Sequence, residues 1–179
     1  MKIGKDVFAV FKRVVGNATK CGMEEHLCTI AVTDMAMYAT NGHMVVVHVG
    51  KQEEQGIISN SEIASARAKG GYFDVSVDPS EQPYVSLDGL LNQFGGYDGV
   101  ASAMRNPTPP VVRRIGWDCL ALLGDPKDWV LAAMPFARKS KKPALADATD
   151  SAILAICTKL PMFAITMPFA NVSYPSCWL

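Results

Sequence analysis

The chain of 179 residues carries 17 Lys and Arg against 17 Asp and Glu, so its formal net charge is zero, and 49% of its residues are hydrophobic. This composition supplies enough apolar side chains for a folded core and excludes a disordered chain. It also excludes a broadly basic nucleic-acid-binding surface, so any DNA contact must come from a local cluster of cations.

The five cysteines are odd in number and lack the CxxC spacing of a zinc site, and residues 1–13 mix charged and apolar side chains, unlike a secretory leader. We therefore expect reduced thiols in a cytoplasmic protein, with no metal and no cofactor. The most apolar stretch, residues 152–172, is interrupted by Thr158, Lys159 and Pro161. No membrane-spanning segment is expected.

The first periodic segment, residues 5–20, predicts an amphipathic helix. Apolar residues recur along it at helical spacing and would face the core: Val7, Phe8, Phe11, Val14, Val15 and Ala18. The opposite side would carry four cations: Lys5, Lys12, Arg13 and Lys20. In a chain of zero net charge this cationic face is the best local indication of a polyanionic partner. A plain solvated helix face explains the same pattern.

Three short runs rich in β-branched residues follow, at residues 27–34, 35–40 and 43–50, and predict strands. The dipeptide Asn41-Gly42 stands between the last two. It is the preferred centre of a type I′ hairpin turn, because both central residues of that turn need a positive φ. The segment therefore predicts a tight hairpin.

The same plan then recurs along the chain. Residues 51–71 are polar and small and predict a long connection with one short helix at 62–68. A strand is expected at 71–78 and a helix at 83–94, which the glycines of residues 95–99 would end. After a proline-rich loop, three further apolar runs predict strands at residues 111–117, 119–124 and 128–137. We therefore expect an α+β fold of two helix-plus-three-strand halves with antiparallel sheets.

A second repetition lies near the C-terminus. Residues 120–138 align without gaps with residues 153–171, and both contain the tetrapeptide Met-Pro-Phe-Ala. Because both segments place apolar runs around a polar turn, we expect a domain at 1–138 and an appended β-hairpin and tail at 139–179. A helix at 144–157 is the competing interpretation. The residues that would share its apolar face are Leu145, Ala148, Ala152, Ile153 and Ile156.

Three segments resemble parts of one domain of the bacterial DNA polymerase III β sliding clamp. Residues 37–47, MYATNGHMVVV, look like the strand–turn–strand pattern of that family, which ends in ATDGHR and an apolar pair. Residues 84–96, YVSLDGLLNQFGG, are similar to the helix that opens its last half-domain. Residues 130–138, VLAAMPFAR, look like its terminal strand. The likeness spans residues 1–138, and the order and spacing of the three segments carry it.

The resemblance implies a DNA-clamp-like domain whose two helices, here residues 5–20 and 83–94, pack on one side toward a central hole, with the sheets outward. Six such domains close a ring that encircles duplex DNA with little sequence reading, through phosphate contacts. Carried over to this chain, the DNA-binding residues would be Lys5, Lys12, Arg13 and Lys20.

The resemblance also implies an outer apolar groove in which partner proteins dock short peptides. In this chain it would be lined by Thr40, Gly42, His43, Met44 and Val45 on one side and by Ala132, Met134, Pro135 and Phe136 on the other. A plain turn with an exposed histidine explains residues 40–45 equally well.

The chain departs from the family at several positions. Asn41 stands where the family has Asp, Met44 stands where it has Arg, and the second helix offers no cation. A single domain could close a ring only as a homo-oligomer that associates head to tail. We therefore expect a non-catalytic, sliding-clamp-like accessory protein of DNA replication or DNA metabolism, a kind of processivity factor that binds partner peptides. The alternative is a clamp-fold protein that has lost DNA encirclement and acts as an interaction or inhibitor module on a host protein.

An enzyme is the rival class. His43 and His48 lie five residues apart on one predicted strand, so their side chains would point to opposite faces and could not share a metal. The sequence contains no Gly-rich phosphate loop, no G-x-S-x-G and no H-E-x-x-H. We expect no catalytic residues.

Overall fold

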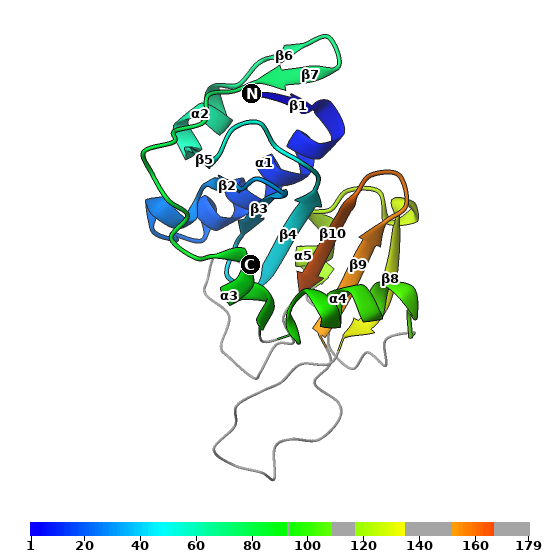
Figure 1. The fold of residues 1–179 in the computed structure, drawn as a ribbon. Coiled ribbons are helices and arrows are strands. Elements are labelled where there is room, and N and C mark those ends of the chain that lie inside the picture. The colour runs from blue at the N-terminus through cyan, green and yellow to red at the C-terminus, as the bar shows by residue number, and fades with distance from the viewer. Residues whose placement is uncertain (93, 109–116, 135–151, 167–179) are drawn as a thin grey trace.

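The computed structural model of the chain describes residues 1–92, 94–108, 117–134 and 152–166 (Figure 1). The larger sheet of this part has seven strands, in the order β5 (Gly56–Ile58), β2 (Ile30–Val32), β3 (Ala36–Thr40), β4 (Met44–Val49), β10 (Met162–Thr166), β9 (Ala152–Cys157) and β8 (Trp129–Met134). The smaller sheet has the order β1 (Lys2–Gly4), β7 (Tyr72–Asp74) and β6 (Ala68–Lys69). The helices are α1 (Lys5–Lys20), α2 (Asn60–Ser65), α3 (Leu87–Asn92), α4 (Gly96–Arg105) and α5 (Trp117–Ala121), with 3-10 turns η1 (Glu25–Leu27) and η2 (Pro126–Asp128). The strand pairs of the described residues are all antiparallel, which confirms the α+β class with antiparallel sheets.

Helix α1 follows β1 directly and has the predicted length. The six apolar residues expected on its inner side are all buried, and Phe8 and Phe11 are completely so. Full burial of one such side chain contributes about 1.5–3 kcal/mol of transfer free energy. The packing of this apolar face against β3 and β4 therefore holds the helix on the sheet.

The hairpin between β3 and β4 forms as predicted, but its turn is of another type. The backbone N–H of Asn41 donates to the carbonyl oxygen of Met44 at 3.2 Å, so Gly42 and His43 are the two central residues. Only Gly42 has a positive φ, 81°, which is the pattern of a type II′ turn, and the type I′ turn centred on Asn41-Gly42 is wrong. The reason is that Oδ1 of Asn41 accepts from the backbone N–H groups of His43 and Met44, at 3.1 and 2.8 Å, which fixes Asn41 at the first position.

The connection predicted at 51–71 contains more structure than expected. It holds the strand β5, which the sequence did not reveal, and the short helix α2, which begins two residues before the predicted 62–68. The hydroxyl of Ser59 accepts from the backbone N–H of Glu62 at 3.2 Å and so caps α2 at its N-terminus.

Residues 95–99 do not form a loop after α3. Gly95 and Gly96 have φ values of 81° and 66°, which glycine adopts without a Cβ clash, and the chain turns there directly into α4. The predicted end of the helix before residue 95 is confirmed, since α3 ends at Asn92, but α4 was not predicted from the sequence.

Residues 119–124 form a helix and turn, where the sequence predicts a strand. Cys119 and Leu123 lie four residues apart and both pack into the core that α1 covers. A short apolar run fits the helical period as well as the strand period, and here the contact with α1 decides between them. The strand predicted at 128–137 is β8 over its described part, and the one predicted at 111–117 lies outside the described residues except for Trp117, where α5 begins.

The predicted C-terminal hairpin is present as β9 and β10. Residues 152–157 are strand, which excludes the competing helix over that stretch, and residues 144–151 lie outside the described part. The hairpin is inserted between β4 and β8, so it completes the larger sheet and is not an appendage at its margin. In the other copy of the repeated segment, α5 stands where the first strand of a hairpin would be.

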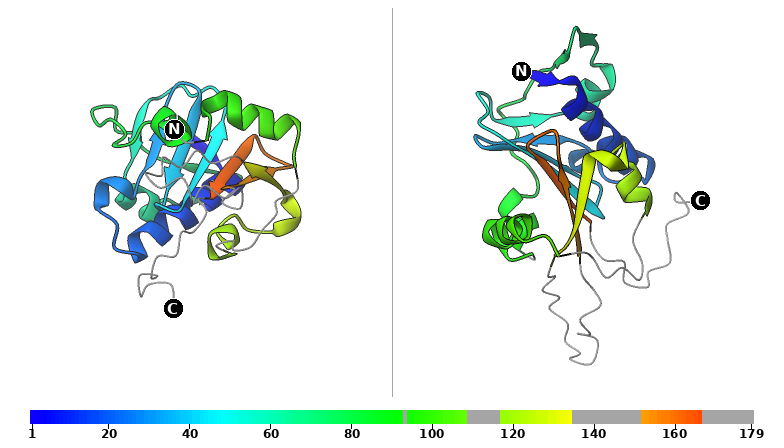
Figure 2. Two further views of the ribbon diagram at one scale, coloured as in Figure 1. Left: turned by 90° about the horizontal axis from the view of Figure 1, so that it is seen from below. Right: turned by 90° about the vertical axis from the view of Figure 1, so that its right-hand side faces the viewer.

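Helix α1 and the pair α3–α4 cover opposite faces of the larger sheet (Figure 2). Along β3, Met37 packs in the core under α1, whereas the next residue, Tyr38, packs in the core under α3 and α4. The expectation that the helices at 5–20 and 83–94 pack on one side is therefore wrong. The physical reason is that β3, β4 and β10 are apolar at nearly every position, so both faces of this sheet must be shielded from water.

It is α2 that lies beside α1. Ile63 of α2 is 2% exposed and belongs to the same core cluster as Phe8. The two helices are parts of two similar units, β1–α1–β2–β3–β4 and β5–α2–β6–β7, which exchange their first strands, since β1 pairs with β7 and β5 pairs with β2. The repeated plan therefore lies within residues 1–74, earlier in the chain than the sequence indicates.

Candidate functional site

The cationic side of α1 faces solvent. Lys5, Lys12 and Lys20 are exposed, and none of the three forms an ion pair with another described residue. Asp6, in the first turn of the helix, is exposed beside them. This arrangement leaves three ammonium groups available to an anionic partner along one helix.

Arg13, the fourth predicted cation, is hydrogen-bonded to two backbone carbonyl groups of the chain. Its Nε donates to the carbonyl oxygen of Leu122 at 2.6 Å and its Nη2 donates to that of Leu123 at 3.1 Å. These carbonyls follow the C-terminus of α5, where unpaired carbonyl groups favour a cation. Partial burial lowers the pKa of Arg13 from its usual value. Arg13 therefore ties α5 to α1.

The residues predicted to line a peptide groove do not meet at one surface. The turn residues and β8 are separated by β10 and β9, and Pro135 and Phe136 lie outside the described residues. The remaining residues that are buried are Met44, Val45, Ala132 and Met134. Met44 packs on the α1 side of the sheet, whereas Val45, Ala132 and Met134 pack on the α3–α4 side. Gly42 is exposed, Thr40 and His43 are half-buried, and burial lowers the pKa of His43.

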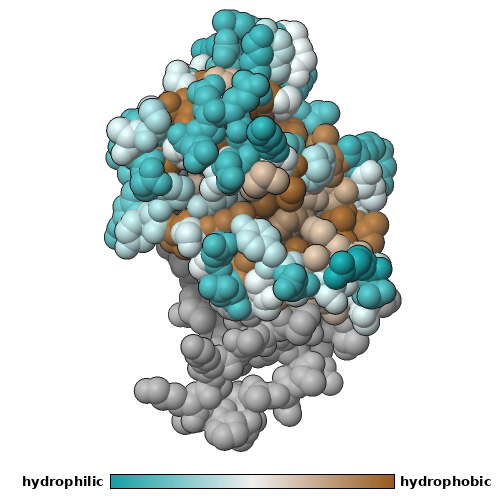
Figure 3. Space-filling model, in the orientation of Figure 1, coloured by the Kyte–Doolittle hydropathy of each residue, from teal (hydrophilic) through white to brown (hydrophobic). Residues whose placement is uncertain are grey.

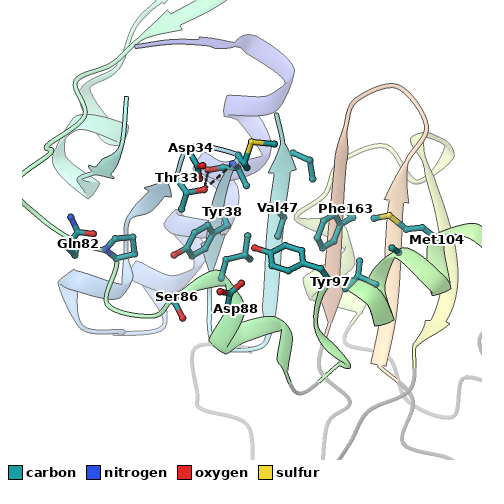
Figure 4. Close-up of a pocket in the computed structure, with 17 residues that line it drawn as sticks. Thr33, Asp34, Tyr38, Val47, Gln82, Ser86, Asp88, Tyr97, Met104 and Phe163 are labelled. Carbon is teal, nitrogen blue, oxygen red and sulfur yellow. Dashed lines mark hydrogen bonds between the residues drawn. The ribbon is translucent and has the colours of Figure 1, made fainter. Parts of the chain in front are cut away.

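A different groove lies on the sheet face opposite α1, between the sheet and α3–α4 (Figure 4). This outer groove has a volume of about 820 Å³ and a floor of side chains from three neighbouring strands: Ala36, Tyr38, Val47 and Phe163. Its wall is formed by α4, with Tyr97, Val100, Ala101 and Met104. Its size is in the range of about 300–1,000 Å³ that is common for binding pockets.

The rim of the outer groove is apolar and open to solvent. Met35 is 58% exposed, Tyr97 is 55% exposed and Val49 is 46% exposed, and all three line the groove. Apolar side chains gather on this face over β4 and β10, next to α4 (Figure 3). An exposed apolar surface of this kind is typical of a site that binds another molecule.

Among the described residues, the carboxylates that line the outer groove are Asp34 and Asp88, and no described Lys, Arg or His lines it. Burial raises the pKa of Tyr97, and the nearby charge of Asp88, its hydrogen bond with Tyr97 and the charge of Asp34 act in the same direction. The hydroxyl of Tyr38 donates to the carbonyl oxygen of Val85 at 2.9 Å, and burial raises the pKa of Tyr38 to about 12. The groove is thus apolar with acidic edges.

The aliphatic hydroxyl groups in the described lining of the outer groove form local hydrogen bonds. Its two aliphatic hydroxyls serve local turns: Thr33 donates to the carbonyl oxygen of Ala36 at 3.0 Å, and Ser86 accepts from the backbone N–H of Gly89 at 3.1 Å. The described lining contains no His.

The histidines lie apart from the outer groove. The ring of His26 contacts that of Tyr84, with centroids 4.2 Å apart, and Nδ1 of His48 is buried without a hydrogen-bond partner. Within the described residues no group of three His, Cys, Asp or Glu side chains could hold a metal ion. Cys28, Cys119 and Cys157 are free thiols, and burial raises the pKa of Cys119 to about 11.

The sequence matches no protein-family model, and a search among curated proteins finds no significant relative. No helix within the described part of the chain is both long and apolar enough to cross a membrane.

The outer groove was missed from the sequence because α4, which forms its wall, was missed. The apolar spacing of Val100, Ala103 and Met104 is a weak helical signal, and the glycines before it obscure the start of the helix. The floor residues were recognised as strand residues, but their exposure depends on what packs above them.

Proposed function

We propose that this chain is a non-catalytic, sliding-clamp-like accessory protein of DNA metabolism. The observation that carries the proposal is the pairing of two helix-and-strand units with exchanged first strands, which brings α1 and α2 together on one face. A sliding-clamp domain likewise carries its two helices on one face. In this proposal α2, and not α3, is the second helix of the clamp pattern.

The lysines of α1 would contact DNA. Lys5, Lys12 and Lys20 are exposed on one side of a single straight element, which suits phosphate contacts that do not depend on base sequence. Helix α2 contains no Lys or Arg, so each copy would contribute its charge through α1 alone. Encirclement of a duplex then requires several copies in a ring.

The opposite face would bind partner proteins. The outer groove lies on the sheet surface that α1 and α2 do not cover, so a protein partner and DNA could be bound at the same time. This division keeps the acidic edges of the groove away from the phosphates.

The decisive experiment compares retention on nicked circular DNA with retention on the same DNA after linearisation. A ring remains on the circle and slides off the linear ends, and the K12A/K20A variant should lower the salt slope of DNA binding by about two per chain. The double variant K51A/K69A removes two exposed lysines outside α1 and serves as the matched control. Equal retention on circular and linear DNA, or equal loss in both variants, would contradict the proposal.

A second candidate is a clamp-fold interaction module that has lost encirclement. The observation that favours it is the pairing of β10 along β4 from Met162↔His48 to Thr166↔Met44, so the chain itself covers the edge of β4. A monomer by light scattering at high concentration, without any DNA retention, would support this second candidate against the first.

A further inference from the structure

We infer that the outer groove binds a protein segment that presents a bulky apolar side chain flanked by Lys or Arg. This inference rests on the proposed role of the groove as the partner site and adds the chemistry of the partner. Two features of the outer groove support it: the exposed apolar side chains at its rim and the negative charge of its carboxylates.

Exposed apolar side chains are concentrated at the rim of the outer groove. Within the described residues five large hydrophobic side chains are exposed: Met35, Val49, Tyr84, Tyr97 and Val130. Three of the five line the outer groove, above a floor that includes Phe163. A ligand that buries this rim must offer apolar area of its own, as an aromatic or branched aliphatic anchor does.

Two carboxylates, those of Asp34 and Asp88, line the outer groove. Asp34 belongs to the turn between β2 and β3, and Asp88 to α3, so they approach the groove from different elements (Figure 4). Neither forms an ion pair with a described Lys or Arg. Both raise the pKa of Tyr97, which shows that both charges reach the same part of the rim. A cation on the ligand would meet complementary charge there.

The same features exclude nucleic acid at this face and favour a protein segment. Two carboxylates with no Lys or Arg beside them in the described lining repel phosphate. The rim side chains Met35 and Tyr97 are more than half exposed, so a segment of a partner chain can reach the groove from solvent.

The test is fluorescence anisotropy with a labelled ten-residue peptide that has Leu-Phe at its centre and one Lys on each side. Two matched peptides carry glutamine or glutamate in place of the lysines. At low salt the Lys peptide should bind about 3–10-fold more tightly than the Gln peptide, and the Glu peptide should bind least, because partly exposed charge pairs contribute modestly. High salt should reduce the difference.

Two pairs of variants locate the effect. Val49→Ser should weaken all three peptides, whereas Val130→Ser should not, and both valines are 46% exposed before substitution. The double variant D34N/D88N should abolish the preference for the Lys peptide, whereas Asp6→Asn, on α1 across the sheet, should retain it. All five substituted residues are exposed, so thermal unfolding should confirm that each variant is folded.

Equal affinity for the Lys and Glu peptides, or a preference that survives in D34N/D88N, would overturn the inference. A groove occupied by a second copy of the chain would also overturn it, and would appear as a dimer that Val49→Ser dissociates. Neither result bears on retention on circular DNA, so failure of this inference and failure of the proposed function are separate outcomes.

Discussion

The side-chain amide of Asn41, in the β3–β4 turn, donates to Oδ1 of Asn17, in α1, at 2.8 Å. Asn41 is 3% exposed, and its own Oδ1 accepts from the backbone N–H groups of His43 and Met44. One buried amide therefore closes the hairpin and ties it to the helix that covers it. Because each buried polar group here has its partner, removal of either amide leaves the other unsatisfied.

Asn41→Ala should lower the free energy of unfolding by about 2–3 kcal/mol, because three hydrogen bonds of roughly 1 kcal/mol each are lost. Asn17→Ala should cost about 1–2 kcal/mol. In a double-mutant cycle by urea denaturation the two should couple by about 0.5–1.5 kcal/mol. Strict additivity of the two free-energy changes would show that the hydrogen bond between Asn41 and Asn17 contributes no coupling energy.

Arg13 and Lys12 are adjacent cations of α1 with different expected effects. Arg13→Ala should destabilise the fold by about 1–2 kcal/mol, because it removes both hydrogen bonds to the carbonyls that follow α5. Arg13→Lys should recover only part of the lost stability, since one ammonium group cannot reproduce both hydrogen bonds of the guanidinium group. Lys12→Ala should change stability by less than about 0.5 kcal/mol.

For DNA affinity, the substitution of Lys12 should have a larger effect than the substitution of Arg13. Lys12→Ala should weaken salt-sensitive DNA binding, and Arg13→Lys, which keeps the charge, should leave it unchanged. A larger loss of DNA affinity in Arg13→Lys than in Lys12→Ala would contradict the assignment of Arg13 to the fold.

His48 should make stability depend on pH. Burial lowers its pKa below the unfolded value of about 6.5, and its Nδ1 has no hydrogen-bond partner. The unfolded chain therefore binds the proton more readily than the folded chain. The free energy of unfolding should be highest above about pH 6.5 and should decrease as the pH falls toward the lowered pKa of the folded state.

His48→Met should flatten this pH dependence, since Met37 and Met162 are its partners on the two neighbouring strands. Burial lowers the pKa of His43 as well, so part of the dependence should remain. Chemical denaturation between pH 5 and 8 would measure it, over the range in which histidine titrates.

Gly56 should tolerate no side chain. Its φ is 140°, and a Cβ there would overlap the carbonyl oxygen of Asp78, whose backbone pairs with Ile57. Gly56→Ala should therefore cost at least about 2–3 kcal/mol. Gly16→Ala, inside α1 with open space around the new methyl group, should stabilise the fold by about 0.5–1 kcal/mol. Thermal unfolding of the two variants should show shifts of opposite sign.

Several elements could be predicted because their signals are local. The apolar stripe of α1, from Val7 to Ala18, repeats at the helical period, and the alternating contacts of the β3–β4 hairpin need only a turn with a glycine at positive φ. The cations on α1 could likewise be assigned to its outer side, but no local pattern reveals that Arg13 reaches Leu122, which lies 109 residues away.

The sequence by itself determined which segments are helix and strand where one period dominated, and which side chains of α1 face inward. Only the tertiary structure decided which face α3 covers, that β10 pairs with β4, and that an open groove remains beside α4. The reason is that β3, β4 and β10 are apolar on both faces, so their sequences fit a helix on either side equally well. The choice is made by contacts between segments far apart in the chain, which no local spacing encodes.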